Sequence, residues 1–176
     1  MTTIACLKVF LVLLVTLFPT QILAQNAALA VCDHTLYRVL CIQHLKWDPA
    51  SKSATTFEDV AMIMLNHATS TAKQISDQLT KRLEEATSSS GGDAIALVNC
   101  SKYYRDAIGK LADSSKALQS RRYDDLKNSM LVAMKAGDKC DQDFKEFGKT
   151  GKSPLGDQGH TYGMLCSIVL QLTIPK

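Results

Sequence analysis

Residues 57–83, FEDVAMIMLNHATSTAKQISDQLTKRL, decide the fold of this chain. Apolar residues recur at steps of three and four along the stretch, which places one continuous apolar stripe on a long helix. Thr55 fits the N-cap of this helix, and Glu58 fits the return partner of a capping box. A helix of this kind has to bury its stripe against other elements. The stripe consists of Phe57, Ala61, Met64, Ala68, Ala72, Ile75, Leu79 and Leu83.

Three further stretches carry the same helical periodicity. A Ser- and Gly-rich break at 88–92 precedes the second helix, with Asp93 as its expected cap, and the third helix begins near Arg122. A loop at 148–159 separates it from a last helix that runs from about Thr161 to Leu172. No stretch shows sustained period-two alternation, so we expect no sheet. Short connections make consecutive helices antiparallel, and the sequence predicts an all-α, up-down-up-down four-helix bundle over 55–174.

Residues 1–24 have the layout of a secretory signal peptide. Lys8 supplies a positive charge, an apolar run follows over 9–18, and Ala24 offers a small residue before a cleavage point. The run is far shorter than the ~20 apolar residues that span a bilayer, which argues against a membrane anchor. We therefore expect a secreted domain over 25–176. The net charge of +3 for the full chain is too small to favour nucleic acid or a membrane as a partner.

Five cysteines remain after this leader, and export favours their oxidation. Cys32 and Cys41 lie in a short helical hairpin over 25–50, where a bridge would stabilise the terminus by about 2.7 kcal/mol. Cys100 and Cys140 lie on the apolar stripes of consecutive helices, where a bridge would contribute about 4 kcal/mol. Cys166 lies beside the stripe of the last helix, and we expect a buried free thiol there.

The hairpin also offers an alternative to a disulfide. Cys32, His34, Cys41 and His44 are zinc-ligand residue types. Their spacing matches no common zinc framework, and export favours oxidised cysteines. We therefore expect no metal.

Catalytic patterns are absent from the sequence. Cys166 and His160 are six residues apart, so a helix does not place them on one face as nucleophile and base. No HExxH, GxSxG, P-loop or GxGxxG pattern occurs. Asn99-Cys100-Ser101 is a glycosylation sequon by pattern, although its middle residue is an expected disulfide partner inside a helix. We expect no enzymatic activity and no cofactor.

Several segments resemble the plant invertase/pectin methylesterase inhibitor family. Residues 32–41, CDHTLYRVLC, are similar to the family's opening, a cysteine pair with Thr and Tyr between, and residues 45–49 resemble the segment that follows. Residues 96–104, ALVNCSKYY, with Ala107 and Leu111, are similar to its AL-x-x-C-x-x-x-Y-x-x-A-x-x-x-L helix. Residues 140–144, CDQDF, resemble its next cysteine segment. The resemblance covers essentially the whole chain after the leader.

This resemblance implies a helical hairpin ahead of a four-helix bundle, with two disulfides that pair cysteines in sequence order. It also implies a proteinaceous inhibitor, expected as a monomer, in the apoplast or cell wall or alternatively in the vacuole. The implied partner is either of two unrelated plant enzymes, acid invertase or pectin methylesterase.

The choice of target depends on a short segment. Invertase inhibitors of the family carry a Pro-Lys-Phe motif that enters the enzyme's active site, and the nearest counterpart here is Arg121-Arg122-Tyr123. A guanidinium can meet a glycosidase carboxylate bidentately, and an aromatic ring can fill a sugar subsite. We therefore expect Arg121, Arg122 and Tyr123 to contact the target enzyme. On this basis we favour acid invertase as the target.

Other functions stay open. Pectin methylesterase inhibitors of the family use polar side chains across the bundle helices, which no short motif marks. Tyr123 also fits the buried stripe of its helix, and the two arginines fit a solvated helix start. A non-inhibitory secreted ligand or pollen protein is a further class, and a lipid carrier would need a cavity.

Overall fold

A computed structural model describes residues 27–86 and 91–173 of the chain. The expected leader, 1–24, lies outside the described residues. The long helices are α3 (Phe57–Ala86), α4 (Gly92–Gln119), α5 (Tyr123–Phe147) and α6 (Asp157–Thr173). Ahead of them lie η1 (Cys32–His34), α2 (Arg38–Trp47) and η2 (Pro49–Lys52). The part of the chain that the structure describes contains no strand, as the lack of period-two alternation predicts.

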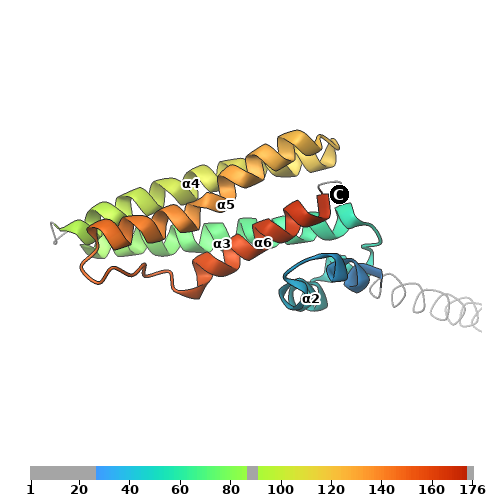
Figure 1. Ribbon diagram of the computed structural model, residues 1–176, viewed down its shortest axis with the longest axis horizontal. Helices are drawn as coiled ribbons and strands as arrows, with labels where there is room; N and C mark the ends of the chain where they lie inside the picture. The colour runs from blue at the N-terminus through green and yellow to red at the C-terminus, as the bar shows by residue number, and fades with distance from the viewer. Residues whose placement is uncertain (1–26, 87–90, 174–176) are drawn as a thin grey trace, which may run out of the picture.

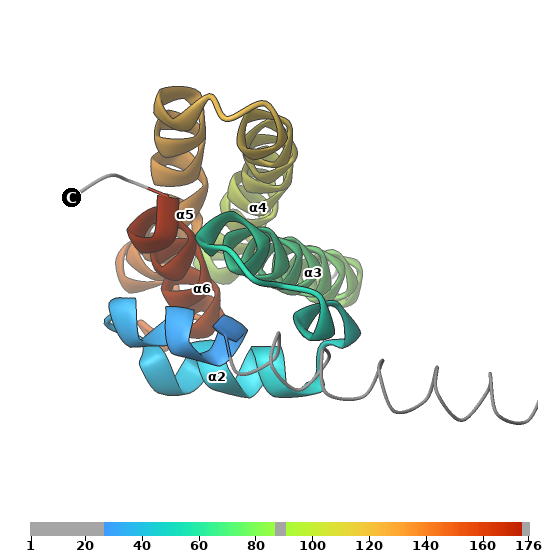
Figure 2. The same cartoon turned by 90° about the vertical axis from the view of Figure 1, so that its right-hand side faces the viewer.

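The four long helices form the expected up-down-up-down bundle (Figure 1). Helix α3 packs against α4 and α6, and α5 packs against the same two helices, so each helix has its sequence neighbours beside it. The hairpin that contains α2 lies across α3 and α6, on the side of the bundle away from the α4–α5 connection (Figure 2). No helix among the described residues is both long and apolar enough to cross a membrane.

The capping box of α3 lies one residue later than the sequence predicts. The N–H of Asp59 donates to Oγ1 of Thr56 at 3.1 Å, so Thr56, and not Thr55, is the N-cap. The carboxylate of Asp59 accepts the N–H groups of Thr55 and Thr56 at 2.9 and 3.0 Å. These hydrogen bonds, led by that of Thr55, lower the pKa of Asp59. Glu58 is not the capping acid because its carboxylate accepts a hydrogen bond from the hydroxyl of Tyr123 in α5.

Two other helix starts differ from expectation. Asp93 lies inside the first turn of α4, and its carboxylate accepts the backbone N–H of Lys149 at 2.8 Å instead of capping α4. This bond fastens the loop after α5 to the beginning of α4. Helix α6 begins at Asp157, four residues before Thr161, because the polar residues in between continue the helical backbone.

The core is built from the stripes that the sequence shows, and its centre contains two tyrosines. Tyr104 of α4 and Tyr162 of α6 are fully buried, and their rings meet edge to face with centroids 5.5 Å apart. The hydroxyl of Tyr162 donates to the carbonyl of Ala133 in α5 at 2.9 Å. Cys100 and Cys140 form a disulfide between α4 and α5. These contacts join α4, α5 and α6 to one another.

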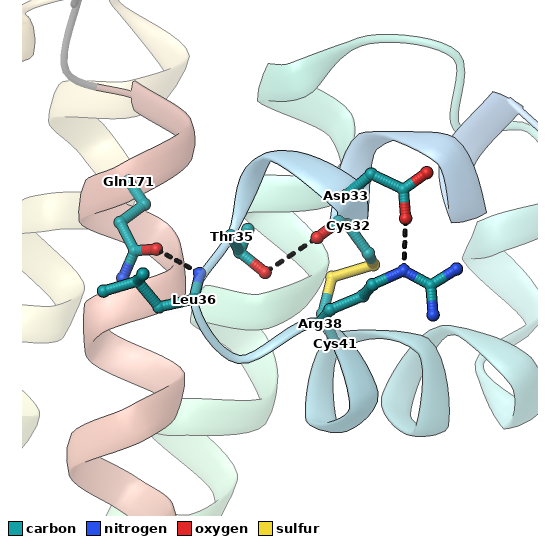
Figure 3. Close-up of a disulfide and its surroundings, with 7 residues drawn as sticks. All are labelled: Cys32, Asp33, Thr35, Leu36, Arg38, Cys41 and Gln171. Atoms are coloured by element: carbon teal, nitrogen blue, oxygen red, sulfur yellow. Dashed lines mark hydrogen bonds and ion pairs between the residues drawn. A yellow bond between two sulfur atoms is a disulfide. The ribbon is translucent and has the colours of Figure 1, made fainter.

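The hairpin is closed by the Cys32–Cys41 disulfide (Figure 3). The hydroxyl of Thr35 donates to the carbonyl of Cys32 at 2.9 Å, which stabilises the turn between η1 and α2. The N–H of Leu36 donates to Oε1 of Gln171 in α6 at 2.6 Å. The hairpin is therefore closed covalently and is also attached to the far end of the chain.

Candidate target-binding site

Three expected contact residues lie at the connection between α4 and α5. Helix α4 ends in a Schellman motif, in which the N–H of Arg122 donates to the carbonyl of Ala117 at 2.8 Å and that of Arg121 to Leu118 at 3.0 Å. The motif needs one left-handed residue, and Arg121 supplies it with a φ of 53°. The turn presents Arg121 and Arg122 as exposed residues at one end of the bundle.

Proline is incompatible with the backbone of Arg121. Its ring fixes φ near −65°, whereas Arg121 has a φ of 53°. A segment with proline in this position would need a different turn. The backbone therefore departs from the Pro-Lys-Phe pattern of the invertase inhibitors at the first residue.

Arg122 and Tyr123 are both engaged within the protein. The Arg122 guanidinium forms an ion pair with Asp125 in the first turn of α5, and both side chains remain more than half exposed. The hydroxyl of Tyr123 donates to Oε1 of Glu58 at 2.8 Å, which joins the start of α5 to the start of α3 and raises the pKa of Tyr123. A hollow of about 280 Å³ lies beside Arg122, lined by Asp113, Lys116, Ala117, Arg122, Asp125, Asn128 and Ser129.

The structure does not assemble the candidate zinc site or the candidate nucleophile–base pair. Cys32 and Cys41 are bonded to each other, so the zinc set loses two of its four ligands. The described residues contain no cluster of three or more His, Cys, Asp or Glu residues that could hold a metal. Cys166 is a fully buried free thiol whose pKa is raised to about 12 by burial, while His160 is exposed. This pair cannot serve as nucleophile and base. Asn99 is half-buried in α4, and its glycosylation stays a prediction.

A cluster that the sequence analysis missed lies between the hairpin and α3. Oδ2 of Asp48 lies 2.9 Å from Nε2 of His67, and the His67 ring contacts that of His44 with centroids 4.5 Å apart. Burial lowers the pKa of His44, the charge of His67 adds to this effect, and Asp48 opposes it. His34 packs against Phe57 at a centroid distance of 5.1 Å. No spacing rule connects these residues, because the contacts are tertiary.

Comparison with known proteins identifies the fold. The sequence matches the family described as plant invertase/pectin methylesterase inhibitor over residues 26–172. The chain belongs to this family. None of the curated proteins is significantly similar to it.

Two solved structures resemble the inhibitor. A mutant form of a pectin methylesterase inhibitor from Arabidopsis has 22% identity and a TM-score of 0.66, with 81% of this chain and 92% of that chain covered. A pectin methylesterase inhibitor from Arabidopsis thaliana has 20% identity and a TM-score of 0.59, with 84% and 93% covered. At these identities the likeness establishes the shared helical fold.

The inhibitor also exposes aliphatic side chains on its two bridged helices. Ile95 and Val98 of α4 are 53% and 55% exposed, and Leu131 and Val132 of α5 are 37% and 54% exposed. They project from the pair that the Cys100–Cys140 disulfide joins. The sequence analysis did not single out these four residues, and nothing in the sequence marks them as a separate surface.

Proposed function

We propose that this protein is a secreted inhibitor that binds and blocks a plant pectin methylesterase and has no catalytic activity of its own. The likeness to two pectin methylesterase inhibitors, over more than nine-tenths of their length, carries this proposal. The left-handed backbone of Arg121 supports it, because the proline of the invertase-inhibitor motif does not fit there. Export directed by the leader expected over 1–24 would bring the protein to the apoplast or cell wall, or alternatively to the vacuole.

The outward faces of α4 and α5 are the surface that we propose for the target enzyme. A rigid surface loses little conformational entropy on binding, and the Cys100–Cys140 disulfide fixes these two helices relative to each other. Exposed aliphatic residues such as Val98 and Val132 among polar neighbours fit an interface with apolar contacts inside a polar rim. The hairpin lies on the opposite side of the bundle (Figure 2).

The experiment compares two enzymes and two variants. Oxidised protein of residues 25–176 is titrated against pectin methylesterase and acid invertase at acidic pH. We expect inhibition of pectin methylesterase alone. Val132→Asp weakens it by about 2 kcal/mol, the scale of an interface hot spot. Val39→Asp is the matched control, since Val39 is 66% exposed on the hairpin, and we expect it to inhibit like the native chain. Inhibition of invertase alone refutes the proposal.

Acid invertase is the second candidate target, because the Arg122 guanidinium is exposed at the end of the bundle. An invertase carboxylate would replace Asp125 as its partner. On this alternative, Arg122→Ala weakens invertase inhibition by about 2 kcal/mol or more. Unchanged inhibition by that variant removes Arg122 from the mechanism.

A further inference from the structure

A notch is lined by residues at the end of α2, at the start of η2 and on α3. The hairpin that contains α2 lies on the side of the bundle away from α4 and α5 (Figure 2). It has a volume of about 430 Å³, within the range of small-ligand sites. Trp47, the last residue of α2 and the only tryptophan of the chain, forms one wall and is 82% exposed. The notch is lined by Gln43, His44, Trp47, Asp48, Pro49 and His67.

The walls of the notch combine a flat apolar plate with hydrogen-bonding groups. The indole of Trp47 offers a π face that attracts C–H groups and cations. Gln43 supplies an amide, which both donates and accepts, and Asp48 supplies an acceptor. Nε2 of His67 is buried and has no hydrogen-bond partner among the residues that the structure describes, although it lies 2.9 Å from the Asp48 carboxylate. A ligand for this notch therefore needs a flat apolar face and several hydroxyl groups at its edge.

A cation lies next to the notch, outside its lining, and offers a partner for an anionic ligand. Asp48 is the only acid in the lining, and its charge faces the His67 ring. Lys46 places its ammonium 5.4 Å from the centroid of the Trp47 ring. Among the described residues Lys46 takes part in no ion pair. A ring stacked on Trp47 would bring an attached carboxylate within reach of this uncompensated cation.

We propose that the notch binds one ring of an acidic oligosaccharide, a hexuronate. The apolar face of the sugar packs on Trp47, its hydroxyl groups bind Gln43 and the Asp48–His67 pair, and its carboxylate faces Lys46. This site is independent of the proposed inhibition, because it shares no residue with the outward faces of α4 and α5. It would hold the protein on an acidic polysaccharide while leaving those faces free.

The single tryptophan makes the proposal directly measurable. Trigalacturonate is added to oxidised protein of residues 25–176, and emission from Trp47 is followed. We expect a saturable change, with binding of the neutral trisaccharide maltotriose about tenfold weaker. No saturable change with trigalacturonate, or equal binding of maltotriose, overturns the proposal.

Substituted proteins, measured by calorimetry, distinguish binding in the notch from nonspecific binding. Trp47→Ala and Lys46→Gln should each weaken trigalacturonate binding about tenfold. Leu36→Ala is the matched control, because Leu36 is 85% exposed on the same hairpin and does not line the notch, and we expect unchanged affinity. Binding that survives in Trp47→Ala overturns the proposal. Trp47→Ala should inhibit pectin methylesterase as well as the native chain does. The sugar-binding proposal and the inhibition proposal can therefore fail independently of each other.

Discussion

At the scale of single residues, Arg121 has a backbone conformation that glycine adopts more easily than arginine does. Its φ of 53° suits glycine, and a non-glycine residue there costs about 1–2 kcal/mol. A glycine in this position would remove that cost, but part of the stability gained would be offset by the greater freedom of glycine in the unfolded chain. We expect Arg121→Gly to raise the free energy of unfolding by about 0.5–1 kcal/mol in urea titrations. Strain at an exposed arginine is consistent with selection for its side chain rather than for stability.

The neighbouring Ser120 provides the control for this prediction. It has a φ of −94°, which any residue adopts. Ser120→Gly should therefore lower the free energy of unfolding by about 0.5 kcal/mol. A stabilising Ser120→Gly, or a destabilising Arg121→Gly, would contradict the left-handed assignment.

The two buried tyrosines differ in hydrogen bonding, so we expect different changes in stability when each loses its hydroxyl. The Tyr162 hydroxyl donates to Ala133, whereas the Tyr104 hydroxyl is buried with no hydrogen-bond partner among the described residues. Tyr162→Phe should lower the free energy of unfolding by about 1 kcal/mol, because the carbonyl of Ala133 loses its donor. Tyr104→Phe should leave it unchanged or raise it by up to about 1 kcal/mol, because an unsatisfied group is removed. Equal losses in both variants, measured by urea unfolding, would contradict this difference.

Sequence reasoning was accurate for residues whose role is local and inaccurate for those whose partners are distant. The threonine-acid pattern at the start of α3 identified a capping box, but it chose Thr55 and Glu58. The structure uses Thr56 and Asp59 because the Glu58 carboxylate binds Tyr123, 65 positions further along the chain. No local rule can reveal that competition.

At the scale of elements, the hairpin is attached to α3 through ionisable groups. His44 faces His67 of α3 and Asp48, and burial lowers its pKa from the ordinary 6.5. The folded state therefore favours the neutral ring. Its contribution to stability is present above pH 6.5 and is lost as the pH falls toward the lowered value, because the unfolded chain then binds more protons.

Replacing His44 tests this pH dependence. We expect His44→Gln to lose less stability than the native chain when the pH falls from about 7.5 to about 5. Urea unfolding followed by circular dichroism at the two pH values gives the difference. His160→Gln is the control, because His160 is exposed on α6, and its pH response should match that of the native chain. Identical responses for His44→Gln and the native chain would contradict the prediction.

The order of the elements was predictable, and their ends were less so. Apolar spacing identified all four long helices, because each buries apolar residues that recur at steps of three and four. The start of α6 was placed four residues too late because Asp157 to His160 contains polar and glycine residues that carry no apolar periodicity. The left-handed end of α4 was missed because arginine, unlike glycine, does not mark such a position.

At the scale of the whole molecule, the hairpin changes the environment of the last helix. Tyr162, Leu165, Val169 and Leu172 recur at steps of three and four and form one apolar stripe of α6. Ile168 and Cys166 lie outside this stripe and are also fully buried. Helix α6 packs against α3 and α5 and is contacted by α2 as well. Because neighbours cover several of its sides, its burial exceeds what a single amphipathic stripe can reveal.

The resulting enclosure of Cys166 gives a chemical measure of unfolding. Cys166 is completely buried, and burial raises the pKa of its thiol to about 12. The thiolate is the reactive form, and the other four cysteines of residues 25–176 are bonded in pairs. Iodoacetamide should therefore leave the native protein unlabelled at about pH 8 and add one label per molecule in denaturing urea. Cys166→Ser should remain unlabelled in both conditions, whereas prompt labelling of the native chain would show that α6 opens without global unfolding.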